Sequence, residues 1–333
     1  MGFDTTTLIL LLTLTPIVLV LSWRWPFWVL SALVLLLPFR DFSIRILNAF
    51  TDIPIETVNS LSRWWFVIIL GQLAVWLIRG LREALRSRRI PRPGLIDALL
   101  GSIIILGVIE ALLSPNRIAG ITSLRGYLQP LAVFVLGRAF IPEDAGQLRR
   151  MHTGLLIVGA LLAAMAFWQL FAWTEETYHT WGYVDQIGRT TGLFRDMGQI
   201  GVEFIRPAAT VSGPNELGSV MLILFFLALL RALISTGLER VMTILLSIAF
   251  LGAMAITNSR SVFLGFAASF LILLVQQAWK ARSRIKAYSA RQWAVFLAAA
   301  LVALVLLWAI MSLSGMLSIV AWSLQNPLAQ VHL

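Results

Sequence analysis

Long uninterrupted runs of apolar residues dominate the pattern of this 333-residue chain. About ten of these runs reach or approach the roughly 20 residues with which a helix crosses a bilayer. Helices satisfy their own backbone hydrogen bonds, which lipid cannot do, so the pattern predicts transmembrane helices. The predicted spans are 6–22, 26–38, 61–79, 94–113, 124–141, 151–172, 214–234, 241–258, 261–278 and 292–313.

The segment between Arg240 and Lys280 is about twice as long as one crossing and contains a single charged residue, Arg260. We therefore expect a hairpin of two helices. Its turn is "TNSR" at 257–260, in which Asn258 and Ser259 are turn-forming residues. This prediction moves Arg260 from the hydrocarbon interior to a membrane face.

Composition supports an all-α polytopic membrane protein, because 59% of the residues are hydrophobic and only 13% are charged. The chain has no cysteine, which excludes disulfides and thiolate metal sites, and we expect neither a metal nor a cofactor. The N-terminus has no basic region and no small-residue cleavage site before its apolar run, so we interpret it as a first helix.

The distribution of basic residues predicts the orientation. If the spans alternate, one side collects 17 of the 26 lysines and arginines, including six arginines in 79–94 and five basic residues in 280–291. Short cytoplasmic loops are rich in such residues, so we assign this side to the cytoplasm and the excess charge to topology, not to nucleic-acid binding. Segments 39–60, 114–123, 173–213 and 257–260 are then extracytoplasmic.

We expect a single transmembrane domain over 1–333. Residues 173–213 combine charged, aromatic and glycine residues and are expected to form an extracytoplasmic cap loop. Residues 314–333 follow the last predicted helix and are expected to begin a further extracytoplasmic loop, so we expect the chain to be truncated.

Arginines gather at the predicted outer interface. An arginine guanidinium matches phosphate oxygens with two parallel hydrogen bonds, which favours a lipid-linked diphosphate as the ligand. Ordinary interfacial snorkelling is the alternative for any single arginine. The candidate diphosphate-binding residues are Arg125, Arg189, Arg195, Arg206, Arg260 and Asn215.

Other chemistry is sparse in the sequence. His179 is a weak candidate for a catalytic base, with an ordinary surface histidine as the alternative. Asp41, Asp52 and Glu56 in the first outer segment resemble the acidic motif of lipid-sugar glycosyltransferases only loosely.

Three stretches together resemble the O-antigen ligase and O-antigen polymerase superfamily of bacterial polysaccharide assembly. The first runs from "LLSPNRIAG" to "AMAFWQ" (112–169), and the second from "GRTTGLF" through "SGPNELG" (188–230). The third is "TNSRSVFLGFAASFLILL" (257–274). They cover about half the chain in the order of the family.

The resemblance implies a glycosyltransferase-C-like bundle of about ten transmembrane helices in the bacterial inner membrane. Such proteins take a glycan from undecaprenyl diphosphate at the outer face and transfer it to an acceptor glycan or lipid. The resemblance places Arg260, and the regions of Arg189 and Asn215, near the diphosphate. The family has a further outer loop with a catalytic arginine and histidine, and we expect the general base beyond Leu333.

Two other function classes stay open at this point. A transporter, such as a lipid-oligosaccharide flippase, usually has polar sites at the bilayer midplane or internal repeats, and neither is evident here. A non-catalytic membrane scaffold is the third possibility.

Overall fold

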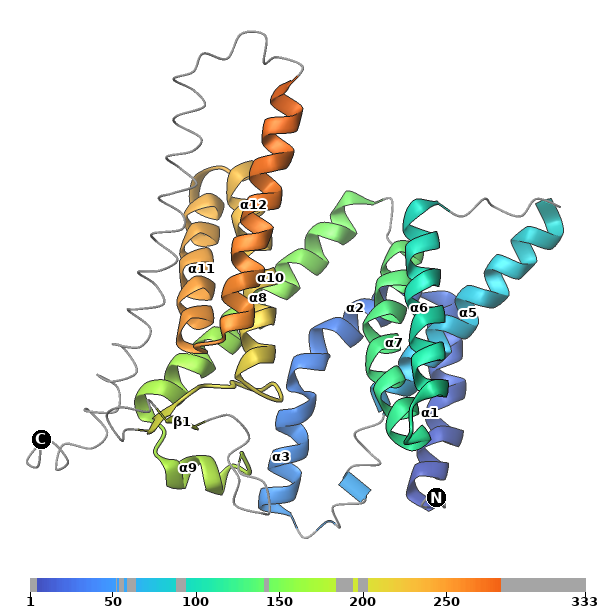
Figure 1. The fold of residues 1–333 in the computed structure, drawn as a ribbon, viewed down its shortest axis with the longest axis horizontal. Coiled ribbons are helices and arrows are strands. Elements are labelled where there is room, and N and C mark those ends of the chain that lie inside the picture. Colours follow the sequence, from blue (N-terminus) through green and yellow to red (C-terminus); the bar gives the residue numbers. More distant parts are fainter. Residues whose placement is uncertain are drawn as a thin grey trace, which may run out of the picture. The chain divides into compact units, whose positions relative to one another are not determined.

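A computed structural model describes residues 5–51, 53, 57–58, 64–87, 94–140, 144–183, 194–196 and 203–282. Within these residues the chain is almost entirely helical (Figure 1). The helices are α1 (Thr5–Arg24), α2 (Pro26–Leu36), a 3-10 turn (Leu37–Phe39), α3 (Arg40–Phe50), α5 (Trp64–Ser87), α6 (Leu95–Leu113), α7 (Arg117–Phe140), α8 (Ala145–Ala172), α9 (Glu175–Thr180), α10 (Pro214–Ile234), α11 (Gly237–Ile256) and α12 (Arg260–Arg282). Two short strands, β1 (Phe194–Asp196) and β2 (Glu203–Ile205), pair antiparallel.

Many of these helices are long and apolar. Within the described part of the chain, five are long and apolar enough to cross a membrane: Pro26–Phe50, Trp64–Glu83, Ala145–Ala172, Pro214–Ile234 and Gly237–Ile256. Shorter apolar stretches occupy Leu12–Arg24, Leu99–Leu113, Leu128–Phe140 and Arg260–Ile272. The prediction of an apolar, helical protein with several candidate membrane helices is therefore confirmed. The count of about ten spans and the glycosyltransferase-C-like bundle stay predictions, and the span 292–313 lies outside the described residues.

Helix α3 differs from the sequence-based expectation. We expected the second span to end near residue 38 and a loop to follow, but α2 continues through the 3-10 turn into α3. The reason is visible in the sequence, because Phe39, Phe42 and Ile46 recur at helical spacing.

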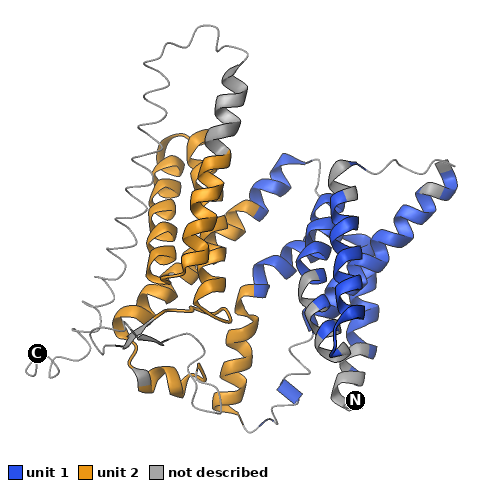
Figure 2. Ribbon diagram, viewed as in Figure 1, with its two compact units in different colours: residues 1–37, 52–151 blue, residues 38–51, 152–333 orange. Residues whose placement is uncertain are grey.

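The chain forms two compact units (Figure 2). One contains residues 1–37 and 52–151, and the other contains residues 38–51 and 152–333. The first unit has a core that includes Leu33, Trp65 and Leu136 from α2, α5 and α7. Gln72 of α5 is fully buried beside this core, and its Nε2 donates to the Pro26 carbonyl at 3.0 Å.

The second unit has its core between α8, α10, α11 and the start of α12. Small residues allow close helix contact here. A Cβ atom added at Gly159 of α8 would lie 2.6 Å from Leu224 Cδ1 of α10 and 2.8 Å from Phe250 Cζ of α11. Membrane helices commonly pack through such small residues, because lipid tails are as apolar as the side chains and the hydrophobic effect does not drive the helices together.

The predicted hairpin is present in this unit. Helix α11 ends at Ile256 and α12 begins at Arg260, so the turn falls on the residues expected from span length. At the opposite end of α11, Arg231 and Glu239 form an ion pair of 2.5 Å that connects α10 with α11.

Candidate functional site

The loop that precedes α10 is hydrogen-bonded to one buried side-chain amide. Gln169 of α8 is fully buried, and its Oε1 accepts hydrogen bonds from the backbone N–H groups of Ala208 (3.1 Å) and Ala209 (2.7 Å). Its Nε2 donates to the Ala209 carbonyl at 3.1 Å. Ala209 has a φ of 47°, a left-handed conformation that costs about 1–2 kcal/mol in an L-residue. The three bonds from Gln169 therefore stabilise a backbone shape that alanine does not prefer.

Helix α3 holds the same loop through Arg45. Its Nη1 donates to the Val211 carbonyl at 3.2 Å and its Nη2 to the Ser212 carbonyl at 2.7 Å. The guanidinium carbon lies 4.1 Å from the centroid of the Tyr183 ring, a cation–π distance. The Tyr183 hydroxyl donates to the Ala209 carbonyl. Arg45 therefore connects α3, the segment after α9 and the loop before α10.

Two further hydrogen bonds place Thr210 against the start of α3. The backbone N–H of Phe42, in the first turn of α3, donates to the Thr210 carbonyl at 3.2 Å. The Thr210 hydroxyl donates to the Pro38 carbonyl at 2.9 Å. The segments 39–60 and 173–213, which sequence analysis assigned to one side of the bilayer, are thus in direct contact.

An aromatic cluster lies beside this loop. Trp173, Tyr178 and Tyr183 are buried, with ring centroids 5.0–5.6 Å apart in edge-to-face arrangements. Burial raises the pKa of Tyr178 well above its usual range. Burial also raises the pKa of Tyr183, although the charge of Arg45 opposes that shift. Both hydroxyls therefore keep their protons into the alkaline range and can donate hydrogen bonds.

Arg206 joins this loop to the α11–α12 turn. Its Nε donates to the Thr257 carbonyl at 2.7 Å, and its Nη2 donates to Asn215 Oδ1 in the first turn of α10 at 2.9 Å. The Arg206 guanidinium thus joins the loop before α10 to a carbonyl that lies 51 positions further along the chain. Because these N–H groups already donate to protein acceptors, Arg206 is better suited to position the turn than to bind a ligand by itself.

The turn itself is tightly ordered. The Thr257 hydroxyl donates to the Met254 carbonyl at 2.7 Å, and Asn258 has a φ of 48°, which asparagine tolerates better than most residues. Ser259 is buried, with its Oγ 3.1 Å from that of Ser261. A Cβ atom added at Gly218 of α10 would lie 2.8 Å from Thr257 Oγ1, so only glycine permits this approach of α10 to the turn.

As a result, the first turns of α10 and α12 lie close together. Helix N-termini carry partial positive charge and unsatisfied N–H groups, which favour anions. Asn215 and Arg260, in these first turns, are both exposed. Glu216, also exposed, adds a negative charge to the first turn of α10. The arrangement offers the exposed Arg260 side chain and two helix N-termini to an anion, with the Glu216 carboxylate nearby.

The other predicted site residues have different positions. Arg125 belongs to α7 of the first unit, whereas Arg206, Asn215 and the turn belong to the second unit. Arg195 lies in β1, where it pairs with Phe204 of β2. His179 is exposed on α9. Arg189 lies outside the described residues, and the base expected beyond Leu333 stays a prediction.

Sequence reasoning missed Arg45 and Tyr183. The amphipathic spacing around Arg45 could have indicated α3, but no sequence signal connects it with a carbonyl 166 residues away. Gln169 is a polar residue near the end of an apolar run, and the sequence gives no indication of its partners.

Comparisons with models of protein families, with curated proteins and with solved structures give no match. The described residues define a helical protein. Several of its helices are suited to a membrane, and one helix hairpin has an arginine-bearing turn.

Proposed function

We propose that this chain is an integral-membrane glycosyltransferase, similar to O-antigen ligases and polymerases, that takes glycan from undecaprenyl diphosphate at the outer face of the bacterial inner membrane. One observation carries the proposal. The second and third stretches of the family resemblance meet in the structure, because Arg206 binds both Asn215 and the Thr257 carbonyl. The arginine-bearing turn is thereby fixed beside the first turn of α10.

The chemistry follows from the charge of the leaving group. In the proposed transfer, an acceptor hydroxyl attacks the anomeric carbon of the donor sugar, and the bond from that carbon to the diphosphate oxygen breaks. The hydroxyl proton passes to a base that the described residues do not identify. Negative charge grows on the diphosphate, where Arg260 and the two helix N-termini stabilise it.

Within this proposal the arginines have separate tasks. Arg260 contacts the diphosphate, whereas Arg206 holds the turn that presents Arg260. Glu216 lies in the first turn of α10 and limits the positive potential there, so the bound diphosphate is expected to lie toward α12.

The test is transfer of glycan by the full-length gene product reconstituted with undecaprenyl-diphosphate glycan and an acceptor. We expect Arg260→Ala to lower the transfer rate roughly 100-fold or more, because one preorganised charge donor in an active site contributes about that much. Arg260→Lys keeps the charge without the fork and should recover part of the rate. Arg240→Ala removes an exposed arginine from the other end of α11 and should leave transfer unchanged.

Equal transfer by the wild type and Arg260→Ala contradicts the role of Arg260. Translocation of labelled lipid-linked glycan without any transfer to the acceptor contradicts the enzyme proposal and supports a transporter.

A further inference from the structure

An exposed pair of aromatic rings, hereafter the Phe50–Trp181 corner, lies in the second unit where the end of α3 meets the end of α9 (Figure 1). Phe50 is 56% exposed, and its ring lies edge-to-face with that of Trp181, with the ring centroids 5.6 Å apart. Phe42, about two turns earlier on α3, stacks on Trp181 with a centroid distance of 6.0 Å. Trp181 is thus held between two phenylalanines, while more than half of Phe50 stays accessible.

A close approach of the chain after α9 to α3 builds this corner. Gly182 follows Trp181 and has a φ of 69°, a conformation that favours glycine. A Cβ atom added at Gly182 would lie 3.1 Å from the Arg45 carbonyl oxygen and 3.6 Å from Ala49 Cβ. Arg45 in turn donates to two carbonyls of the loop before α10. The Phe50–Trp181 corner and the loop that leads into the candidate site are therefore packed on the same helix.

The corner also has a hydrogen-bond donor that the protein does not use. Trp181 is half-buried, and its Nε1 makes no hydrogen bond within the described residues and is not a buried atom, so the indole N–H faces solvent. Among the described residues of α3 and α9, Phe50 is the one large apolar side chain that is exposed. The other exposed side chains of the two helices are small or polar: Ser43, Asn48, Ala49, Glu176, His179 and Thr180.

This composition differs from that of the helices predicted to face lipid. On α11 the exposed apolar side chains are dense: Leu238, Val241, Met242, Ile244, Leu245 and Ile248. A single accessible ring with an N–H donor and polar neighbours is instead typical of a carbohydrate site. The C–H bonds on one face of a sugar ring carry partial positive charge and pack on the negative face of an aromatic ring, while the sugar hydroxyls need polar partners.

We propose that the Phe50–Trp181 corner binds one sugar ring of the glycan chain. The C–H face of this sugar lies on the Phe50 ring, and one of its hydroxyls accepts a hydrogen bond from Trp181 Nε1. The assignment rests on the proposed function, because it places in the corner a sugar of the donor glycan beyond the one that is bonded to the diphosphate. Phe50 lies about 7.5 Å of helix rise beyond Arg45, which binds the loop before α10.

The experiment measures glycan binding by calorimetry with the full chain in phosphatidylcholine nanodiscs. The probe is the glycan released by mild acid from the undecaprenyl-diphosphate glycan of the source cells, so it carries neither lipid nor diphosphate. We expect Phe50→Ala to weaken binding about five- to tenfold, and Phe50→Leu nearly as much, because leucine is apolar but has no aromatic face. Phe50→Tyr keeps the ring and should retain binding. Trp181→Phe loses the N–H donor and should weaken binding about threefold.

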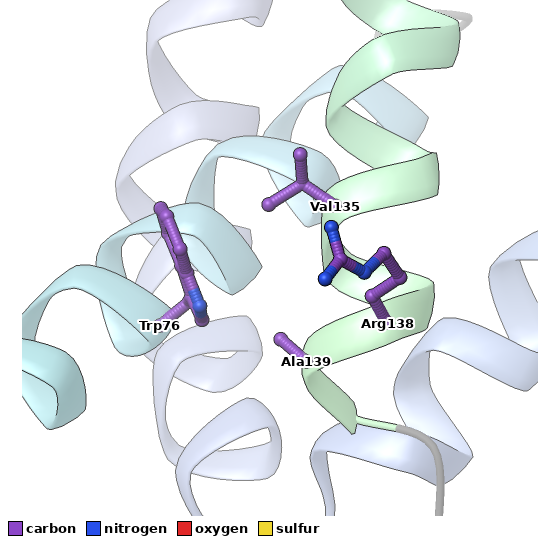
Figure 3. A pocket seen from close by; sticks show the side chains of 4 residues that line it. All are labelled: Trp76, Val135, Arg138 and Ala139. Carbon is purple, nitrogen blue, oxygen red and sulfur yellow. The ribbon is translucent and has the colours of Figure 1, made fainter. Parts of the chain in front are cut away.

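Two matched variants control for the loss of any exposed aromatic ring. Phe171→Ala removes a phenylalanine that is 49% exposed at the end of α8, on the membrane side predicted for the corner. Trp76→Phe changes a tryptophan that is 37% exposed in the first unit, beside a small cavity that Val135, Arg138 and Ala139 also line (Figure 3). Both variants should bind the free glycan as the wild type does.

Equal affinity of the wild type and Phe50→Ala for the free glycan overturns the proposal, and so does the absence of measurable binding by the wild type. Quenching of Trp181 by phosphatidylcholine brominated in its acyl chains also overturns it, because the corner then lies in the bilayer. The contribution of Trp181 to this quenching is the difference between the wild type and Trp181→Phe.

The transfer assay described above separates this proposal from the proposed function. A wild type that transfers glycan, while Phe50→Ala binds the free glycan equally well, contradicts the sugar subsite alone. A wild type that binds the free glycan through Phe50 but transfers none contradicts the glycosyltransferase activity alone.

Discussion

The arginines of the two compact units are held in different ways. In the second unit, Arg45 and Arg206 donate to the backbone carbonyls of the α10 loop and the α11–α12 turn. In the first unit, Arg79 makes one carbonyl bond, to Trp23, and Arg79 and Arg82 both lie over the Trp23 ring. The second unit therefore uses its arginines to order a loop and a turn between helices, whereas the first unit uses Arg79 to join α5 to the end of α1.

An arginine at a predicted membrane face is therefore not identified as a phosphate ligand by its position alone. Arg206 and Arg260 were both candidates in the sequence, and the family resemblance pointed to Arg260. Arg206 now has two partners from the protein, and Arg260 stands exposed beside the turn that Arg206 positions. Four substitutions in the second unit test how the α10 loop, the α11–α12 turn and the aromatic cluster beside the loop are held.

The largest effect is expected at Gln169. Gln169→Leu leaves the buried backbone N–H groups of Ala208 and Ala209 without their side-chain acceptor, which should lower the free energy of unfolding by roughly 3 kcal/mol or more. Gln72→Leu in the first unit is the matched control. Gln72 makes one hydrogen bond, and its buried Oε1 has no partner within the described residues, so the loss should be below about 1 kcal/mol. Thermal unfolding in detergent measures both losses. Equal shifts in melting temperature would contradict the expectation that Gln169 stabilises the protein more than Gln72 does.

Gly218→Ala should have the next largest effect. The added Cβ would lie 2.8 Å from both Thr257 Oγ1 and Val262 Cγ2, so the turn must move away from α10, at a cost of about 1–3 kcal/mol. Gly80→Ala on α5 meets no atom within 4 Å and should stabilise that helix by up to about 1 kcal/mol. Opposite signs of the two changes in melting temperature are the expected result. An unchanged or raised melting temperature in Gly218→Ala would exclude a tight contact at Gly218.

Arg45→Lys should have a smaller effect, of about 1–2 kcal/mol, because one ammonium cannot reproduce the two carbonyl bonds and the stacking on Tyr183. Arg82→Lys in the first unit should change stability by less than about 0.5 kcal/mol, because Arg82 is exposed. The rate of protease cleavage in 206–213 reports the local opening directly. Unchanged protection in Arg45→Lys would show that α3 does not hold this loop.

The smallest effect concerns pH. Burial raises the pKa of Tyr178, so the folded protein keeps this proton above pH 10 while the unfolded chain releases it. The folded state then binds more protons, and its stability falls as pH rises above about 10, by up to about 1.4 kcal/mol per pH unit. Tyr178→Phe should make this alkaline decline shallower and leave stability near pH 8 little changed. Melting temperatures of the wild type and Tyr178→Phe at pH 8, 10 and 11 test this prediction. Parallel declines in the two proteins would show that burial does not raise the pKa of Tyr178.

Part of this fold could be predicted because it depends on local pattern. The hairpin at 257–260 follows from the length of the apolar segment, and the helical class follows from composition. The segment 40–50 looked like a loop because Asp41, Arg45 and Asn48 obscured its amphipathic spacing. The partners of Gln169 and Arg45 could not be predicted, since they are main-chain groups about 40 and 166 residues away, without any side-chain signature.

The contact between α3 and the α10 loop has a consequence for the time course of synthesis. Arg45 is made 166 residues before the Val211 carbonyl that it binds. At roughly 5–20 residues per second, α3 exists for about 10–30 s before its partner is translated. The contact between α3 and the α10 loop therefore forms late, after at least the intervening helices α5 to α8 have been made.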